Sequence, residues 1–221
     1  MTSTDTRLVL VRHGQSVAQA EGFFSGHDTC RGLSDLGRAQ AKALRARLEE
    51  SGELRGTDVL YTSNLDRAVE TADLIEPALD AQRRESDCEF CEIRAGEAEG
   101  LSYQEAADRF PPLRQRWDAY DRRVPGSETW AEFFVRAGAR LRRIATEHEN
   151  ERIVLVCHGG IIGATFATLG HTPIIDALPL AYEPVNTSLT EWRHDGKRWD
   201  LVRYNDAAHL HGDLRTDRPQ G

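Results

Sequence analysis

Two short hydrophobic runs of nearly identical sequence lie 145 residues apart, and each ends abruptly at a His-Gly pair. The first run covers residues 8–11 and leads into His13, and the second covers residues 153–156 and leads into His158. An apolar, β-branched run of this length, bounded by glycine, is typical of a buried strand in a parallel sheet. Ligands of open α/β sheets bind beyond the carboxyl ends of such strands, so the pattern places both histidines where chemistry usually occurs. Two buried structural histidines are the alternative, which the repeated context disfavours.

Between the two hydrophobic runs, and after the second one, the sequence shows helical periodicity and turn signals. A Ser or Thr followed three residues later by Glu predicts a capped helix start, because the two side chains satisfy backbone N–H groups there. Residues 14–32 are predicted to form a glycine-punctuated loop. The other predicted elements are a helix capped by Ser34, a strand near 59–61, a helix over 66–79, an extended segment over 89–93, a short helix after Ser102, a long helix from Thr129 to His148, a helix over 160–169, and a hairpin of 187–194 and 197–204 turning at Asp195-Gly196.

This alternation of strands and helices predicts an α/β sandwich with a mostly parallel sheet. No long linker, repeat or low-complexity block interrupts it, so we expect a single domain over residues 1–221. Residues 206–221 form a polar C-terminal tail, which we expect to be a loose arm or a flap over the site.

Composition narrows the class of protein. The chain has 221 residues, of which 39% are hydrophobic and 29% are charged, as in globular proteins. No stretch approaches the roughly 18 apolar residues of a membrane span. The polar N-terminus carries no signal-peptide core, so we expect a cytoplasmic protein without a membrane partner. The net charge of −8 argues against nucleic-acid binding. Only Lys42 and Lys197 are lysines, so arginine is the default cation, and position must distinguish a functional arginine.

The four cysteines do not form the framework of a small secreted protein. Cys88 and Cys91 have CxxC spacing, but no second cysteine pair completes a zinc site. The pair does not open a helix as a thioredoxin-type motif would. The sequence therefore predicts neither a metal site nor a redox function at these positions.

The residues around the first histidine suit phosphate chemistry. The guanidinium of Arg12 matches a phosphate bidentately and keeps its charge. A neighbouring arginine also disfavours imidazolium, so we expect the pKa of His13 to lie below its usual value of about 6.5, which leaves a lone pair for attack. Arg67 falls in the first turn of a predicted helix after a strand, where it and the helix amides could face one anion. From its position alone, a solvent-facing role is equally compatible.

Phosphoryl transfer to histidine also needs a proton for the leaving oxygen, and a protonated carboxyl group is a suitable donor. Three glutamates cluster after the predicted extended segment: Glu92 at its end, and Glu97 and Glu99 in the following loop. The residues alone leave these three choices open.

An ordered series of motifs resembles the histidine phosphatase superfamily, which includes cofactor-dependent phosphoglycerate mutase. The resemblance spans nearly the whole chain and implies a three-layer α/β/α sandwich of the phosphoglycerate mutase type. The motifs, in order, are Arg12-His13-Gly14, Phe24-Ser25-Gly26, Leu33-Ser34-Asp35-Leu36-Gly37-Arg38-Ala39-Gln40-Ala41, Ser63-Asn64-Leu65-Asp66-Arg67-Ala68 with Thr71-Ala72, Glu92-Ile93 before Gly96 and Glu99-Gly100, and Val156-Cys157-His158-Gly159-Gly160.

The resemblance implies a role for each site residue. His13 is the residue that becomes phosphorylated, and Glu92 is the acid and base, while Glu97 and Glu99 are structural or solvated. It also implies catalysis without a metal or cofactor. The groups expected to hold the phosphoryl oxygens are Arg12, Arg67, His158 and the backbone amide of Gly159. Phosphate close to His158 is expected to keep that ring protonated, so activity should fall above neutral pH.

Some positions depart from the family pattern. Gln19 stands where many members have a phosphoryl-binding Asn, and its role is open. Ser25 and Gly26 match a substrate-contact position of the mutases. Mutases also carry a longer segment between the acid glutamate and the second histidine, with a paired arginine; here 65 residues intervene, and we interpret Arg122-Arg123 as incidental.

The compact segment favours a phosphatase acting on a small phosphorylated metabolite. A homodimer is compatible with the sequence. The alternatives are a mutase-type phosphotransferase and a non-catalytic phospho-ligand-binding relative. A metallohydrolase using His13, His158 and Glu92 is disfavoured, because Arg12 and Arg67 would repel the cation.

Overall fold

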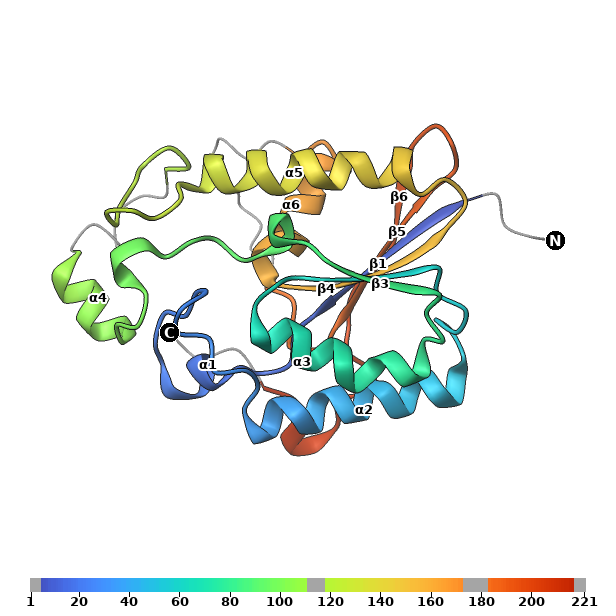
Figure 1. The fold of residues 1–221 in the computed structure, drawn as a ribbon, viewed down its shortest axis with the longest axis horizontal. Helices are drawn as coiled ribbons and strands as arrows, with labels where there is room; N and C mark the ends of the chain where they lie inside the picture. Colours follow the sequence, from blue (N-terminus) through green and yellow to red (C-terminus); the bar gives the residue numbers. More distant parts are fainter. Residues whose placement is uncertain (1–4, 111–117, 173–182, 217–221) are drawn as a thin grey trace.

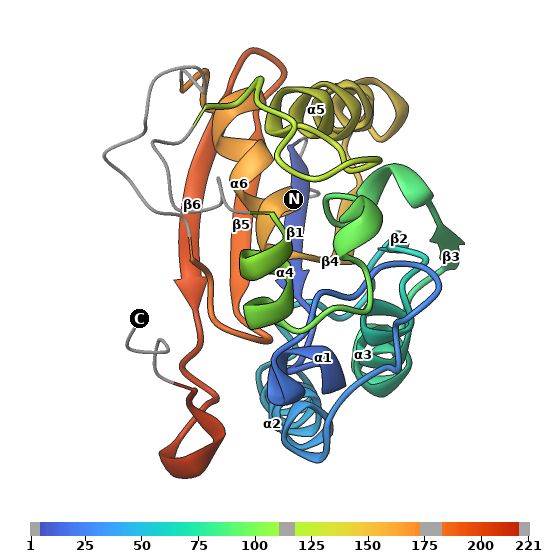
Figure 2. The ribbon, with the colours of Figure 1, turned by 90° about the vertical axis from the view of Figure 1, so that its left-hand side faces the viewer.

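A six-stranded sheet forms the centre of the computed structural model, which describes residues 5–110, 118–172 and 183–216. Its strands are β1 (Thr6–Arg12), β2 (Val59–Thr62), β3 (Arg83–Ser86), β4 (Arg152–Cys157), β5 (Leu189–His194) and β6 (Trp199–Asp206). They lie in the order β3-β2-β4-β1-β5-β6, as Figure 2 shows from one edge to the other. The first four of these are parallel, and β5 and β6 add an antiparallel hairpin. The predicted mostly parallel sheet is confirmed.

Helices cover both faces of the sheet (Figure 1). One face carries α2 (Asp35–Ser51) and α3 (Asp66–Ile75), and the other carries α5 (Trp130–Glu147) and α6 (Gly159–Thr168). Successive side chains of β1 alternate between the two layers, because side chains of a strand point to opposite faces. Leu8 and Leu10 join the core beneath α5 and α6, whereas Val9 and Val11 join the core beneath α2 and α3. The continuously hydrophobic strand β1 therefore contributes side chains to the cores on both faces of the sheet.

Three predicted helix starts are confirmed by their caps. The Ser34 side chain accepts a hydrogen bond from the Gly37 amide at the start of α2. Ser102 and Thr129 form complete capping boxes at the starts of α4 (Tyr103–Arg109) and α5. These local signals place the helix boundaries without help from the rest of the fold.

Two predictions are wrong. The loop predicted over 14–32 contains a short helix, α1 (Val17–Glu21), capped by Ser16 and ended by Gly22 in the left-handed region (φ +76°). The extended segment predicted over 89–93 is not a strand; residues Cys88–Phe90 form a 3-10 turn, and the edge strand is β3, upstream. All four side chains of β3 are exposed. A polar edge strand carries no hydrophobic signal, so its sequence could not reveal it.

The described part of the predicted tail is docked and is not a loose arm. Its first residue, Asp206, ends β6 and forms an ion pair with Arg47 of α2 at 2.6 Å. Farther along, the Gln40 side chain of α2 donates a hydrogen bond to the Leu214 carbonyl at 2.9 Å. The last five residues of the chain lie outside the described ranges. Among the described helices, none combines the length and apolar character needed to cross a membrane.

Candidate active site

The parallel pairing of β1 with β4 brings the two histidines together. Arg12 pairs with Cys157 at the ends of these strands, so His13 and His158 follow side by side. Their ring centroids are 5.1 Å apart, and both side chains are buried. The repeated sequence pattern therefore becomes one site at the carboxyl edge of the sheet.

The hydrogen bonds of His13 indicate which ring nitrogen carries the proton. Its Nδ1 lies 2.6 Å from the Gly14 carbonyl oxygen, so we assign the proton to Nδ1, which donates to that oxygen. The Arg67 Nε donates to His13 Nε2 at 3.2 Å, so Nε2 keeps its lone pair. This arrangement holds the ring as the neutral tautomer with Nε2 directed toward Arg67.

Burial is the main reason that His13 stays neutral. The pKa of His13 is lowered well below its usual 6.5, first by loss of solvation and then by the positive charges of Arg67 and Arg12. The lowered pKa expected from the sequence is confirmed. Its largest cause is burial, with the neighbouring arginines adding to it.

Glu92 reaches the site because the residue opposite is a glycine. Its Oε2 accepts a hydrogen bond from the Gly160 amide at 3.0 Å, and its Oε1 accepts one from the Ile93 amide at 3.1 Å. A Cβ atom at position 160 would lie 2.2 Å from Glu92 Oε1. Any side chain there would displace the carboxylate from the start of α6.

The other two glutamates have structural partners. Glu97 forms an ion pair with Arg109 at 2.6 Å on the surface. Glu99 accepts hydrogen bonds from the Asp28 amide at 2.8 Å and the Thr29 amide at 3.1 Å. The contacts therefore distinguish the three glutamates: Glu92 faces the start of α6, and Glu99 organises the loop over residues 26–29.

Two buried nitrogens at the site have no partner within the part of the chain that the structure describes: Arg12 Nε and His158 Nδ1. Buried donors are nearly always paired, so this orphaned pair marks a place for acceptor oxygens. Gly159 is the first residue of α6, where backbone N–H groups are open. A Cβ atom on it would lie 3.8 Å from Arg12 Nε. Together these groups form a cradle suited to a phosphoryl group.

His158 takes a different partner from His13. Its Nε2 lies 2.8 Å from the Ser63 hydroxyl oxygen. The pKa of His158 is lowered well below 6.5, first by burial and then by the charge of Arg67. We therefore assign a neutral ring in which Ser63 donates to Nε2 and the Nδ1 proton faces the cradle. The expected protonation of His158 thus stays a prediction for a phosphate complex only.

The residues predicted to bind substrate divide into two groups. Gln19 has a structural role, because its Oε1 accepts hydrogen bonds from the Ser16 amide at 3.1 Å and from Asn186 Nδ2 at 3.2 Å. Its side chain also lines a cavity of about 630 Å³ together with Arg12 and Gly159.

Ser25 and Gly26 belong to the loop after α1. Ser25 lines a cavity of about 500 Å³, and its buried hydroxyl has no partner among the described residues. Gly26 packs against Glu99, because a Cβ atom there would lie 2.3 Å from its carboxylate. Ser25 therefore borders the cavity with its hydroxyl buried, whereas Gly26 is needed for the loop to approach Glu99.

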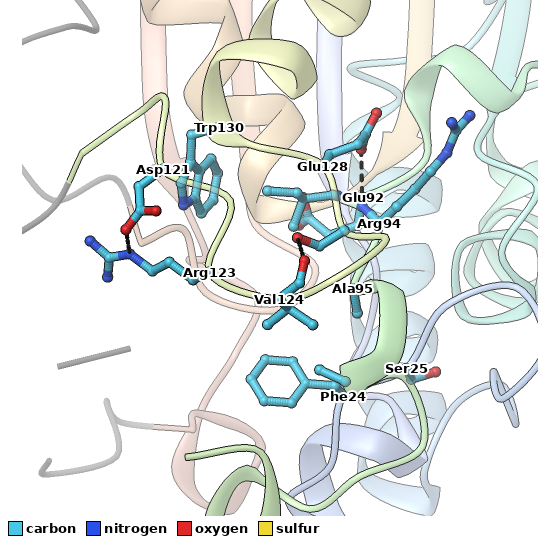
Figure 3. Close-up of a pocket in the computed structure, with 13 residues that line it drawn as sticks. Phe24, Ser25, Glu92, Arg94, Ala95, Asp121, Arg123, Val124, Glu128 and Trp130 are labelled. Carbon is cyan, nitrogen blue, oxygen red and sulfur yellow. Dashed lines mark hydrogen bonds and ion pairs between the residues drawn. The ribbon is translucent and has the colours of Figure 1, made fainter. Parts of the chain in front are cut away.

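The cavity beside Ser25 also contains Glu92 (Figure 3). Its walls are largely hydrophobic, and Arg123, paired with Asp121 at 3.3 Å, lies at one side. Arg122 instead bonds to Glu132 and the Ser127 carbonyl. The two neighbouring arginines therefore do not form a joint grip, in agreement with their interpretation as incidental.

A family comparison completes these observations: residues 8–207 match the model of the histidine phosphatase superfamily (branch 1). The chain belongs to this superfamily. It is 32% identical over 210 residues to phosphoglycerate mutase-like protein 4 of Arabidopsis thaliana, covering 92% of this chain and 86% of that protein. It is 27% identical over 208 residues to the metal-independent phosphoserine phosphatase of Arabidopsis thaliana, covering 93% and 83%.

A solved structure gives the same picture of the fold. The mycobacterial glucosyl-3-phosphoglycerate phosphatase in complex with VO3 has a TM-score of 0.75 and 27% sequence identity to this chain, covering 90% of this chain and 99% of that one. The phosphoglycerate mutase-like fold and the superfamily, both predicted from the motifs, are thereby confirmed.

Two residues that position the histidines of this superfamily member were missed by reasoning from the sequence. Ser63, which contacts His158, lies within a motif that carried the resemblance, but its role was not assigned. Asn186 donates from Nδ2 to the His13 carbonyl at 3.0 Å and to Gln19. In the sequence Asn186 shows only an Asn-x-Ser pattern, which points to no catalytic role.

Proposed function

We propose that this protein is a phosphomonoesterase that hydrolyses a small phosphorylated metabolite through a phosphohistidine at His13. The observation that carries this proposal is the buried, neutral imidazole whose Nε2 lone pair lies 3.2 Å from Arg67 Nε. When a phosphoryl group binds, its oxygens attract the Arg67 guanidinium away from the ring. The Nε2 lone pair then faces phosphorus and can attack it.

In the first step, His13 Nε2 attacks phosphorus in line, so that an N–P bond forms and the bond to the ester oxygen breaks. Glu92 in its acid form gives its proton to the leaving alkoxide. The charge on the transferring oxygens is held by Arg12, Arg67 and the His158 Nδ1–H.

In the second step, Glu92 is a carboxylate and takes a proton from water. The water oxygen attacks phosphorus, the N–P bond breaks, and inorganic phosphate leaves with the neutral imidazole restored. The amide of Gly160, which donates to Glu92, keeps the carboxylate oriented through both steps.

Catalysis by these steps needs no metal ion, because arginine and imidazole N–H groups supply the electrostatic stabilisation. Arg67 donates to the one His13 nitrogen that could ligate a cation. The metal-independent relative named above supports this part of the proposal.

The substrate's organic part is proposed to occupy the cavity beside Glu92. A space of about 500 Å³ suits a small molecule, and it adjoins the acid that protonates the leaving group. Hydrophobic walls with Arg123 at one side favour a compact leaving group that carries both apolar and polar surface. Arg122 bonds to Glu132, so among the described residues Arg122 and Arg123 do not pair to hold a second anionic group, which favours hydrolysis over mutase-type transfer.

The test is release of inorganic phosphate from a panel of small phosphomonoesters in the presence of a chelator. We expect turnover in the wild type, none with His13→Ala, and strongly reduced turnover with Glu92→Gln. Glu97→Gln is the matched control, since Glu97 pairs with Arg109 on the surface. Loss of turnover with the chelator, or equal activity of His13→Ala and wild type, would overturn the mechanism.

A further inference from the structure

A second group of reactive side chains lies beside the catalytic glutamate. His27, from the loop after α1, meets Cys88 and Cys91 at the turn after β3. The three ligand atoms all lie within 4.8 Å of one another, and His27 Nε2 is 3.6 Å from Cys88 Sγ. The CxxC pair that lacked partners in the sequence therefore gains an imidazole from a segment about 60 residues upstream.

These distances suit a tetrahedral zinc ion. Zn–S bonds of about 2.3 Å and Zn–N bonds of about 2.0 Å place sulfur and nitrogen roughly 3.6 Å apart at tetrahedral angles. Two sulfurs bound to the same ion lie roughly 3.8 Å apart. The existing separations therefore need side-chain movements of no more than about 1 Å to close around an ion.

The burial of the three groups suits an ion that enters from solvent. His27 is exposed, Cys88 is partly buried, and Cys91 is buried. The backbone between the two cysteines is held in place, because Arg136 donates to the carbonyls of Glu89 at 2.8 Å and Cys91 at 3.1 Å. A preformed turn presents both thiols to one side, where the histidine completes the group.

We propose that His27, Cys88 and Cys91 form a binding site for one thiophilic divalent cation of the Zn²⁺ class. On binding, each thiol loses its proton to solvent and forms a metal–sulfur bond, and His27 contributes its Nε2 lone pair. The two thiolate charges balance the charge of the ion, and water takes the fourth position. This site is separate from the phosphoryl cradle and plays no part in the two chemical steps.

A short chain of contacts connects the ion site to His158. Cys91 Sγ lies 3.4 Å from the Ser63 hydroxyl, and that hydroxyl lies 2.8 Å from His158 Nε2. A metal-bound thiolate is a stronger acceptor than a thiol, so it draws the Ser63 proton away from His158. Occupation of the site is therefore expected to lower phosphatase turnover; this consequence rests on the proposed function, whereas ion binding does not.

Binding is tested with Zn²⁺ alone, on the purified full-length chain kept reduced by a phosphine. We expect one tightly bound zinc per chain, measured by competition with a chromogenic chelator. Cys88→Ser and His27→Ala should each weaken the affinity by at least about tenfold. Cys30→Ser is the matched control, because the Cys30 thiol contacts Arg67 at 3.5 Å and is outside the group.

Co²⁺ supplies a readout that does not depend on activity or on small changes in stability. The wild type should show thiolate-to-cobalt absorption that Cys88→Ser reduces and Cys30→Ser retains. Absence of stoichiometric zinc, unchanged affinity in both ligand variants, or equal weakening by Cys30→Ser would overturn the proposed site.

The coupling is tested by titrating zinc into a turnover assay. One equivalent should lower wild-type turnover several-fold and leave Cys88→Ser turnover unchanged. Equal inhibition of both would show that zinc acts at the phosphoryl cradle and would overturn the coupling. If the metal-free wild type shows no turnover with any substrate, the proposed function fails while the binding results stand.

Discussion

His13 and His158 occupy equivalent ends of neighbouring parallel strands, within almost the same sequence, and yet their rings are prepared for different tasks. His13 donates from Nδ1 to its neighbour's carbonyl and keeps a lone pair on Nε2. His158 has Ser63 at Nε2 and leaves Nδ1 open. A shared local pattern thus places two rings, and their hydrogen-bond partners decide which ring nitrogen carries the proton. In the proposed mechanism this difference makes His13 the group that attacks phosphorus and His158 a donor to its oxygens.

Replacing each histidine in turn tests this difference most directly. His13→Ala removes the nucleophile, and we expect kcat to fall by about 10⁴-fold or more. His158→Ala removes one donor to the phosphoryl oxygens, and we expect a loss of about 10²–10³-fold. Steady-state phosphate release measures both losses, and intact-protein mass after an alkaline quench detects the phosphorylated chain. Phosphorylated protein from His13→Ala, or a larger loss from His158→Ala, would reverse the assignment.

Glu92→Gln separates the acid role from the roles of the two rings. We expect kcat to fall by about 10²–10⁴-fold for alkyl phosphates, because their leaving oxygen needs a proton. The loss should be much smaller for p-nitrophenyl phosphate, whose leaving group departs as a stable anion. The comparison of the two substrates is the measurement. An equal loss for both would contradict proton donation by Glu92.

Ser63→Ala removes the partner that distinguishes His158 from His13. We expect kcat to fall by roughly tenfold, which corresponds to about 1.4 kcal/mol for one lost hydrogen bond. The Km should change little, because Ser63 acts through the orientation of a ring. Thr57→Ala is a suitable control, since its buried hydroxyl bonds to the Leu54 carbonyl away from both cavities. A change confined to Km would count against a positioning role for Ser63.

The pH dependence of stability should show the smallest effect. Both histidines have pKa values lowered well below 6.5 by burial, so below that pH the unfolded chain binds protons that the folded chain does not. The free energy of unfolding should therefore decrease as pH falls below about 6.5, and the decrease should continue down to the lowered pKa values. Denaturant titrations at several pH values measure the slope, which His158→Asn should reduce. An unchanged slope would contradict burial of a neutral ring at this position.

Local signals in the sequence account for much of the fold. The hydrophobic runs predicted β1 and β4, and the Ser and Thr caps predicted where α2, α4 and α5 begin. Such signals are readable because strand burial and helix capping depend on residues adjacent in the chain. The exposed edge strand β3 was missed because the energy of an edge strand comes from backbone pairing with β2, which leaves no hydrophobic pattern.

For the site, the sequence by itself placed His13 and His158, with Arg12, at the carboxyl ends of two buried strands, and the motifs indicated the superfamily; the position of Arg67 left its role open. Only the tertiary structure decided the details that depend on distant partners. Gly160 admits the carboxylate of Glu92, and Ser63 reaches His158 from 95 residues upstream. Cys88 likewise meets His27 only through folding. Hydrogen-bond partners and ring protonation depend on which remote atoms lie within about 3 Å, and no local pattern records that distance.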